Sequence, residues 1–274
     1  MTEAVRICTA ASSATATPDC RGNVLVSGSY GGKYNAFHAG KHGLRGVVLN
    51  DAGVGLNDAG IDGLDYLDAV GLPAATAAAR SCHIGDGEHM LEHGIVSYVN
   101  GSAAHLGCAA GQGVRECAEL MCRGPIVNAA MPPISGGKRY EMSAPGAMPP
   151  VVCLDAAPML EPRDAGSIVI TGSHAALFRG RPDDVIKYAV RAIFFSDAGV
   201  GLDSAGIARL PTLDERGIAA ATASVASAAI GNARSIYYDG VLSHVNAAAA
   251  ACNAIPGMRV RVFVASLVER WRSA

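Results

Sequence analysis

The feature that most constrains the fold of this chain is an internal repeat. The segment DAGVGLNDAGI (51–61) recurs as DAGVGLDSAGI (197–207), with nine of eleven positions identical. At the same offset of 146, residues 51–100 align with residues 197–246 without a gap, and half of the positions are identical. Alanine-rich composition cannot place Asp, Gly, Ser and Asn in one register. The sequence therefore predicts a tandem duplication of a domain-sized unit, far longer than a solenoid repeat.

A segment rich in Pro and Gly, MPPISGGKRYEMSAPGAMPP, separates the two copies and has no helical or strand periodicity. We accordingly predict a first α/β repeat over residues 1–130, a linker over 131–150 and a second α/β repeat over 151–274.

Within the first copy, short apolar strands alternate with helical segments that often end at glycine. The expected strands are 23–29, 44–50, 72–79 and 95–100, and the expected helices are 33–43, 63–71 and 86–94. This alternation is typical of a parallel sheet covered on both faces. The predicted class is α/β, with two parallel-sheet repeats related by a pseudo-twofold; the type of residues 257–271 is left open.

The amino-acid composition argues against nucleic acid and membrane surfaces as binding partners. The net charge is −2, aromatic residues are few and Lys and Arg do not cluster, so neither nucleic acid nor a membrane surface is an expected partner. No apolar run reaches the length of a membrane span, and the N-terminus lacks the pattern of a signal peptide. Eight cysteines without a CxxC pair suit a reducing cytoplasm. We expect a small-molecule substrate, and self-association into a homo-oligomer is compatible with the sequence.

Ligands of open parallel sheets bind beyond the carboxyl ends of the strands, where the two copies match best. Asp51 and Asp197 leave such strands and are candidate bases or orienting carboxylates; the alternative is that they cap their own turns. The neighbouring glycines let the backbone approach a ligand closely. The candidates for this role are Gly28, Gly31, Gly53, Gly55 and Gly199.

Hydroxyl residues occur as matched pairs, namely Ser29 and Ser173, Thr76 and Thr222, and Ser81 and Ser227. Ser29 and Ser173 are candidate nucleophiles, and the Thr76 and Ser81 pairs are candidate substrate contacts. Turn and capping bonds are the alternative role for all of them. Cys82 is a candidate nucleophile beside His83, although neighbours on an extended strand point to opposite faces.

Polar residues that differ between the copies are further candidates. His83, Asp86 and His174 are expected to contact substrate. The HMLEH segment (89–93) matches an inverted zinc-peptidase pattern, but its helix is short and no third ligand follows, so no metal is predicted. The SGSYGGK turn (27–33) is one residue short of a phosphate loop.

Together these features predict a small-molecule metabolic enzyme without an organic cofactor. The expected reaction is hydrolysis of an amide or a cyclic amide-like polar metabolite in a cleft between the repeats. The alternatives are an isomerase or lyase that works by proton transfer, a non-catalytic metabolite-binding protein, and a structural subunit of an assembly.

Overall fold

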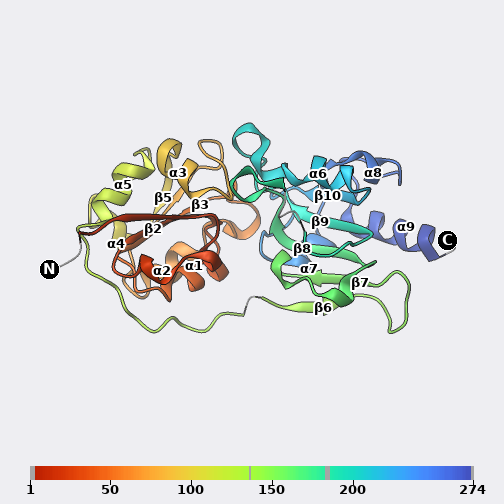
Figure 1. Ribbon diagram of the computed structural model, residues 1–274, viewed down its shortest axis with the longest axis horizontal. Coiled ribbons are helices and arrows are strands. Elements are labelled where there is room, and N and C mark those ends of the chain that lie inside the picture. The colour runs from red at the N-terminus through yellow and green to blue at the C-terminus, as the bar shows by residue number, and fades with distance from the viewer. Residues whose placement is uncertain (1–3, 136, 183–185, 273–274) are drawn as a thin grey trace.

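The computed structural model describes residues 4–135, 137–182 and 186–272 as two α/β halves that lie side by side, each built on one sheet (Figure 1). The first sheet has the order β1-β2-β3-β4-β5, and the second has the order β11-β10-β9-β8-β7-β6. The strands of the first sheet are β1 (Ile7–Ala10), β2 (Val24–Tyr30), β3 (Gly46–Asn50), β4 (Ala74–Ala77) and β5 (Val96–Val99). Those of the second are β6 (Arg139–Glu141), β7 (Val151–Leu154), β8 (Ile168–His174), β9 (Ala192–Ser196), β10 (Ala219–Ala223) and β11 (Leu242–Val245).

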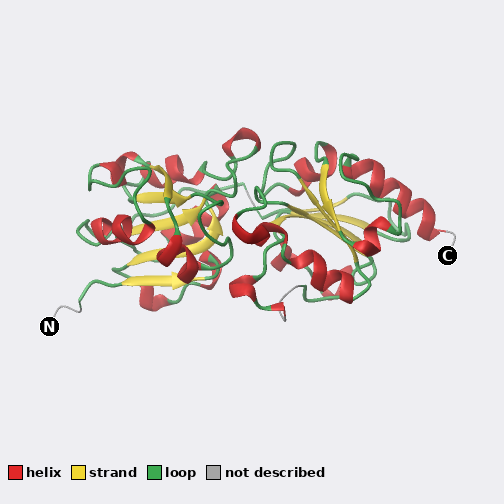
Figure 2. Ribbon diagram, turned by 90° about the horizontal axis from the view of Figure 1, so that it is seen from above, coloured by secondary structure: helices red, strands yellow, loops and turns green. Residues whose placement is uncertain are grey.

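Helices cover both faces of each sheet (Figure 2). In the first half they are α1 (Lys33–Gly40), α2 (Gly63–Asp68), α3 (Gly87–His93), α4 (Gly101–Ala104) and α5 (Val114–Met121). In the second half they are α6 (Arg209–Glu215), α7 (Ala233–Tyr238), α8 (Ala247–Ala250) and α9 (Val260–Arg272). None of the helices in the described part of the chain combines the length and the apolar composition that crossing a membrane requires.

Both sheets are mixed, which corrects the prediction of parallel sheets. The strands β1 to β4 and β7 to β10 run parallel, but β5, β6 and β11 pair antiparallel with their neighbours. The cause is visible at β5: the amide of Ala78, at the end of β4, donates to the carbonyl of Ile95, where β5 is about to begin. Since β5 starts where β4 stops, it must run back along it.

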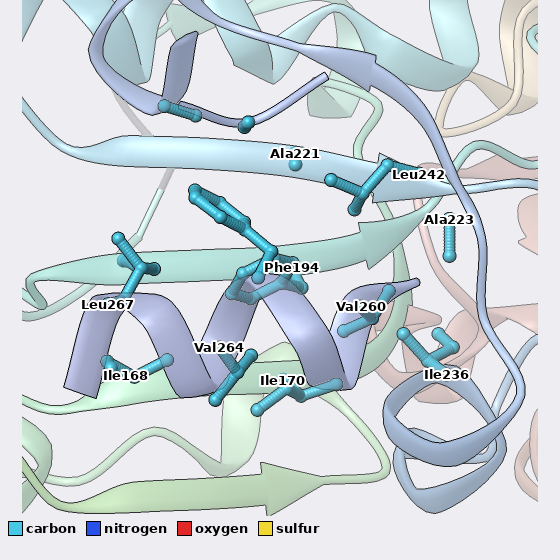
Figure 3. Close-up of a cluster of buried hydrophobic side chains, with 14 of the residues drawn as sticks. Ile168, Ile170, Phe194, Ala221, Ala223, Ile236, Leu242, Val260, Val264 and Leu267 are labelled. Carbon is cyan, nitrogen blue, oxygen red and sulfur yellow. The ribbon is translucent and has the colours of Figure 1, made fainter. Parts of the chain in front are cut away.

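The central strands β3, β4, β9 and β10 are mostly apolar because both of their faces are buried, as a covered sheet requires. In the second half, Ile168, Ile170 and Phe194 lie against Val264 and Leu267 of α9 (Figure 3). Residues 257–271, whose type the sequence leaves open, therefore consist mostly of this amphipathic helix. Neighbouring positions on the same strands, such as Val169 and Ile193, enter the core on the opposite face.

The predicted linker is more ordered than its composition indicates. Residues 139–141 form β6 of the second half. A segment that we call the strap, residues 131–135 and 137–138, leads from below the first half toward β6 in Figure 1. Residue 136 lies outside the described residues. The Tyr66 hydroxyl donates to the carbonyl of Pro132 at 2.6 Å. At the other end, Lys138 donates its amide to Asp155 at 2.9 Å, and its carbonyl accepts the amide of Asp155 at 3.0 Å.

Candidate functional site

The two DAGVG segments form the same unusual turn. In residues 52–55 and 198–201, every φ lies between 48° and 75°, although alanine and valine occupy half of the positions. A left-handed turn costs a non-glycine residue about 1–2 kcal/mol, and strain of this kind is kept where surrounding structure enforces it. The same geometry in both segments explains why the sequence recurs almost unchanged.

Asp51 and Asp197 hold these turns in place. An oxygen of Asp51 accepts the amides of Gly53 and Ala79, both at 2.9 Å. The corresponding oxygen of Asp197 accepts the amides of Gly199 at 3.0 Å and of Val225 at 3.1 Å. Each buried carboxylate thereby ties its turn to the end of the next strand. This bonding is what the capping alternative predicts for the two aspartates.

The two turns also hold the halves together, in a contact that we call the loop junction (residues 52–56 and 198–202). A Cβ added to Gly53 would lie 2.9 Å from the Cα of Gly199, and the reverse distance is also 2.9 Å. The Leu56 amide donates across to the Val225 carbonyl at 2.8 Å, and the Leu202 amide donates back to the Ala79 carbonyl at 2.9 Å. Backbone packs directly on backbone here, so the glycines serve this close approach.

Next to the loop junction lies a cavity of about 710 Å³, which we call the strap cavity. Its walls come from both halves and from the strap. They are lined by Tyr30, Gly32, Lys33, Tyr34, Asn57, Ala59, Asp62 and Tyr66 of the first half, by Tyr140, Asp155, Ala229, Ile230, Gly231 and Asn232 of the second, and by Pro132, Pro133, Ile134, Ser135 and Lys138 of the strap. The size suits a small metabolite. Parts of the SGSYGGK turn (27–33) and of residues 227–232 thus share one cavity.

Tyr30, the last residue of β2, lies deep in this cavity. It is nearly buried, and a Cβ at Gly231 of the other half would overlap its hydroxyl. Burial, and then the nearby carboxylates of Asp62 and Asp155, raise the pKa of Tyr30 well above its ordinary value. The phenol therefore keeps its proton and is a hydrogen-bond donor at neutral pH.

Asp62 and Asp155 face the same space but are bonded differently. Asp62 accepts the amide of Lys33 at 2.8 Å with one oxygen, and its other oxygen lies 3.7 Å from the Lys33 ammonium group. Burial raises the pKa of Asp62 in spite of these contacts. Asp155 accepts backbone amides with both oxygens, from Lys138 at 2.9 Å and Ala233 at 3.2 Å. The second oxygen of Asp62, which faces the Lys33 ammonium group and no backbone amide of the described chain, is therefore the candidate to take up a proton.

The serine and threonine pairs that the sequence proposes are engaged in structural hydrogen bonds. Ser29 accepts the amide of Ser13 at 3.0 Å, and Ser173 accepts that of Ala157 at 2.9 Å. Ser81 and Ser227 each bridge a turn carbonyl and a later backbone amide. Thr76 and Thr222 pair with the hydroxyls of Ser97 and Ser243 at 3.1 and 3.0 Å. These bonds agree with the turn and capping alternative, and none of them joins the hydroxyl to a base.

Cys82 and His83 have different surroundings, although they follow a turn after β4 and do not lie on the extended strand assumed from the sequence. Cys82 is fully buried, and burial raises the pKa of its thiol to about 12, the opposite of an activated nucleophile. The His83 ring bonds Asp203 of the other half at 2.9 Å and stacks on His89 at 3.8 Å between ring centroids. A thiolate–imidazole pair is not formed.

The remaining predicted residues are also placed. Asp86 caps α3 by accepting two amides at 3.0 Å. A Cβ at Gly28 or Gly31 would strike backbone atoms, and one at Gly55 would press on Val225. Within the described ranges, no group of three or more His, Cys, Asp or Glu residues could hold a metal ion.

A second cavity, of about 420 Å³, is lined by Asp51, Gly53 and Gly199, together with Arg80, Ser97 and Tyr98.

His174 occupies in the second half the place that Tyr30 has in the first, at the end of β8. Its ring is buried, and Nδ1 accepts the amide of Ala176 at 3.2 Å. Burial, and then the charge of Arg209, lower the pKa of His174 to about 3. Since the unfolded pKa is about 6.5, the stability that neutral His174 contributes is present above that pH and is lost as pH falls toward 3.

We therefore expect His174→Asn to flatten the acid dependence of stability, because an amide oxygen can still accept the Ala176 bond but does not titrate. Between pH 7.5 and 5, the variant should lose about 2 kcal/mol less unfolding free energy than the unaltered protein in urea titrations. The exposed His93→Asn serves as control and should follow the unaltered protein. Equal pH slopes for His174→Asn and the unaltered protein would contradict the assignment.

Sequence reasoning missed Asp62, Lys138 and Asp155, and it noted Tyr30 and Lys33 only as part of the SGSYGGK turn. The signal for Tyr30 and Lys33 was asymmetry, because His174 and Leu177 replace them in the second copy. Asp155 and Lys138 reach the cavity from regions outside the clear repeat, so no comparison of the copies could find them. Comparisons of the chain with protein-family models, curated proteins and solved structures gave no match.

Proposed function

We propose that this protein is a small-molecule enzyme that performs general acid–base catalysis on a polar carbonyl compound in the strap cavity. The observation that carries the proposal is the juxtaposition of Asp62, a carboxylate with raised pKa and an available oxygen, and Tyr30, a buried phenol that stays protonated. Asp62 would take a proton from the substrate or from water, and Tyr30 would donate a hydrogen bond to the carbonyl oxygen as negative charge develops there.

Proton transfer within the substrate, as in an isomerase or lyase, needs no protein nucleophile and fits this set of groups directly. Hydrolysis of an amide or cyclic amide, the reaction expected from the sequence, would use water as nucleophile with the same two side chains. A covalent route has less support, because the candidate serines are engaged in backbone hydrogen bonds and the Cys82 thiol is buried.

We further propose that the halves arose by tandem duplication, with repeats over 1–130 and 151–274 joined by residues 131–150 and related by a pseudo-twofold through the loop junction. Support comes from the two hydrogen bonds that cross the junction, Leu56 to Val225 and Leu202 to Ala79, since 56 and 79 become 202 and 225 on adding 146. A cytoplasmic location and the absence of nucleic-acid partners stay predictions from the sequence.

The test is a proton NMR assay in D₂O with a defined mixture of small oxo acids, lactams, cyclic imides and their amides. Deuterium uptake next to a carbonyl would identify proton transfer, whereas new carboxylate signals would identify hydrolysis. We expect Asp62→Asn to slow the reaction at least about 100-fold and Tyr30→Phe about 10- to 100-fold, as for loss of a general base and of an oxyanion donor.

Asp239→Asn and Tyr238→Phe are matched controls, because these exposed side chains do not line the strap cavity. Both should retain full activity. Unchanged substrates throughout, or turnover that survives Asp62→Asn and Tyr30→Phe, would overturn the proposal.

A further inference from the structure

The two lysines that line the strap cavity, Lys33 and Lys138, differ in whether a carboxylate balances their charge. The Lys33 ammonium group lies 3.7 Å from the carboxylate of Asp62. Lys138 also lines the cavity, but in the described part of the chain its ammonium group forms no ion pair. Asp155, which holds the main chain of Lys138, already accepts two backbone amides. The charge of Lys138 is thus available to a ligand.

The main chain fixes Lys138 at the cavity rim even though it belongs to the strap. Its amide and its carbonyl both bond to Asp155, at 2.9 and 3.0 Å, and β6 begins at the next residue. Arg139 cannot substitute for it, because its guanidinium binds Asp164 and Glu141. A pinned backbone with an unpaired ammonium group is suited to hold an anionic group at one position.

We propose that the substrate of this cavity carries an anionic group, a carboxylate or a phosphate, and that Lys138 of the strap is the residue that selects for it. The inference rests on the proposed function for the identity of the site. The substrate class is then an anionic carbonyl compound, with its charged end at Lys138 and its carbonyl toward Tyr30. The side-chain oxygen of Asn232 caps α7 by accepting the Ser235 amide. Its side-chain N–H groups have no hydrogen-bond acceptor among the described residues and can support the same anion.

Three probes that share a carbonyl but differ in charge test the inference: pyruvate, dihydroxyacetone phosphate and the neutral pyruvamide. Binding is measured by ligand-observed NMR titration and requires no turnover. We expect the unaltered protein to bind one or both anions more tightly than pyruvamide, and Lys138→Met to weaken anion binding about 10-fold or more. The anion whose affinity falls identifies carboxylate or phosphate as the group recognised.

Two further variants separate charge recognition from a structural role. Lys138→Arg should restore most of the anion affinity, and Lys41→Met, an exposed lysine on the segment after α1, should leave it unchanged. Pyruvamide binding should not respond to Lys138→Met. Equal anion affinity in Lys138→Met and the unaltered protein, binding of neither anion, or failure of arginine to rescue would overturn the inference.

The outcome is distinguishable from failure of the proposed function. Normal anion binding in Lys138→Met with loss of turnover in Asp62→Asn would refute the role of Lys138 and leave acid–base catalysis standing. Weakened anion binding in Lys138→Met together with undiminished turnover in Asp62→Asn and Tyr30→Phe would support the role of Lys138 and refute the proposed acid–base catalysis.

Discussion

Gly199→Ala is expected to lower the unfolding free energy by about 2–5 kcal/mol. Its φ of +69° costs alanine about 1–2 kcal/mol. The added methyl group would also lie 2.9 Å from the Cα of Gly53, and backbone cannot yield as a flexible side chain does, so overpacking adds about 1–3 kcal/mol. Equilibrium unfolding in guanidinium chloride measures the loss.

Gly217→Ala is the matched control in the same half. Its φ is +66°, and a Cβ there meets nothing within 4 Å. This variant should show only the conformational cost of about 1–2 kcal/mol. The difference between the two variants isolates the contact across the loop junction. If both lose the same free energy, the close approach of the two DAGVG turns does not contribute to stability.

Asp164→Ala is expected to lower the unfolding free energy by about 3–5 kcal/mol, since it strips a mostly buried cation of its partner. Asp164 is 1% exposed, and its two oxygens receive the guanidinium of Arg139 at 3.0 and 2.5 Å. This pair fastens β6 to the turn before β8. Burial would raise the pKa of Asp164, but the bonds from Arg139 and the Glu161 amide outweigh it and hold the pKa below its ordinary value.

Because the folded pKa is depressed, the stability that Asp164 contributes is present above its unfolded pKa of about 3.9 and is lost as pH falls through the folded value. The difference in unfolding free energy between the unaltered protein and Asp164→Ala, measured in urea titrations, should accordingly become smaller at strongly acidic pH. Glu141→Ala, which removes the exposed second partner of Arg139, should change stability by only about 0–1 kcal/mol. If Glu141→Ala lowers the unfolding free energy as much as Asp164→Ala does, burial of the Arg139–Asp164 pair is not the cause of its contribution to stability.

Much of the fold could be predicted from periodicity and glycine placement. The strands β2 to β5 and the helices α1 to α3 lie where alternation and terminal glycines indicate them. The direction of β5 could not be predicted, because it depends on where Ile95 meets the end of β4 rather than on its own sequence. Strand β6 was missed because Arg139 and Glu141 are polar and become ordered through a distant partner, Asp164.

The candidate site was predicted at the level of loops and less well at the level of residues. The repeat singled out Asp51, Asp197 and their glycines as candidate catalytic or binding residues. A contact between the two similar turns can require the same residues without any catalytic role. The groups that best support catalysis, Tyr30 and Asp62, stand where the copies differ. In this chain, the residues shared by the two repeated segments form the loop junction, whereas the site that we propose uses residues that differ between them.

The strap has a consequence for how the halves stay associated. It carries the only crossing of the described chain between one sheet and the other, so docking of the halves is an intramolecular event. A short tether of this kind supplies an effective concentration in the millimolar range, which favours the docked arrangement. The tether therefore adds to the contacts between the halves, which comprise the loop junction and a buried cluster formed by Tyr30, Ala52, Ile84, Ala176, Ala198 and Ile230.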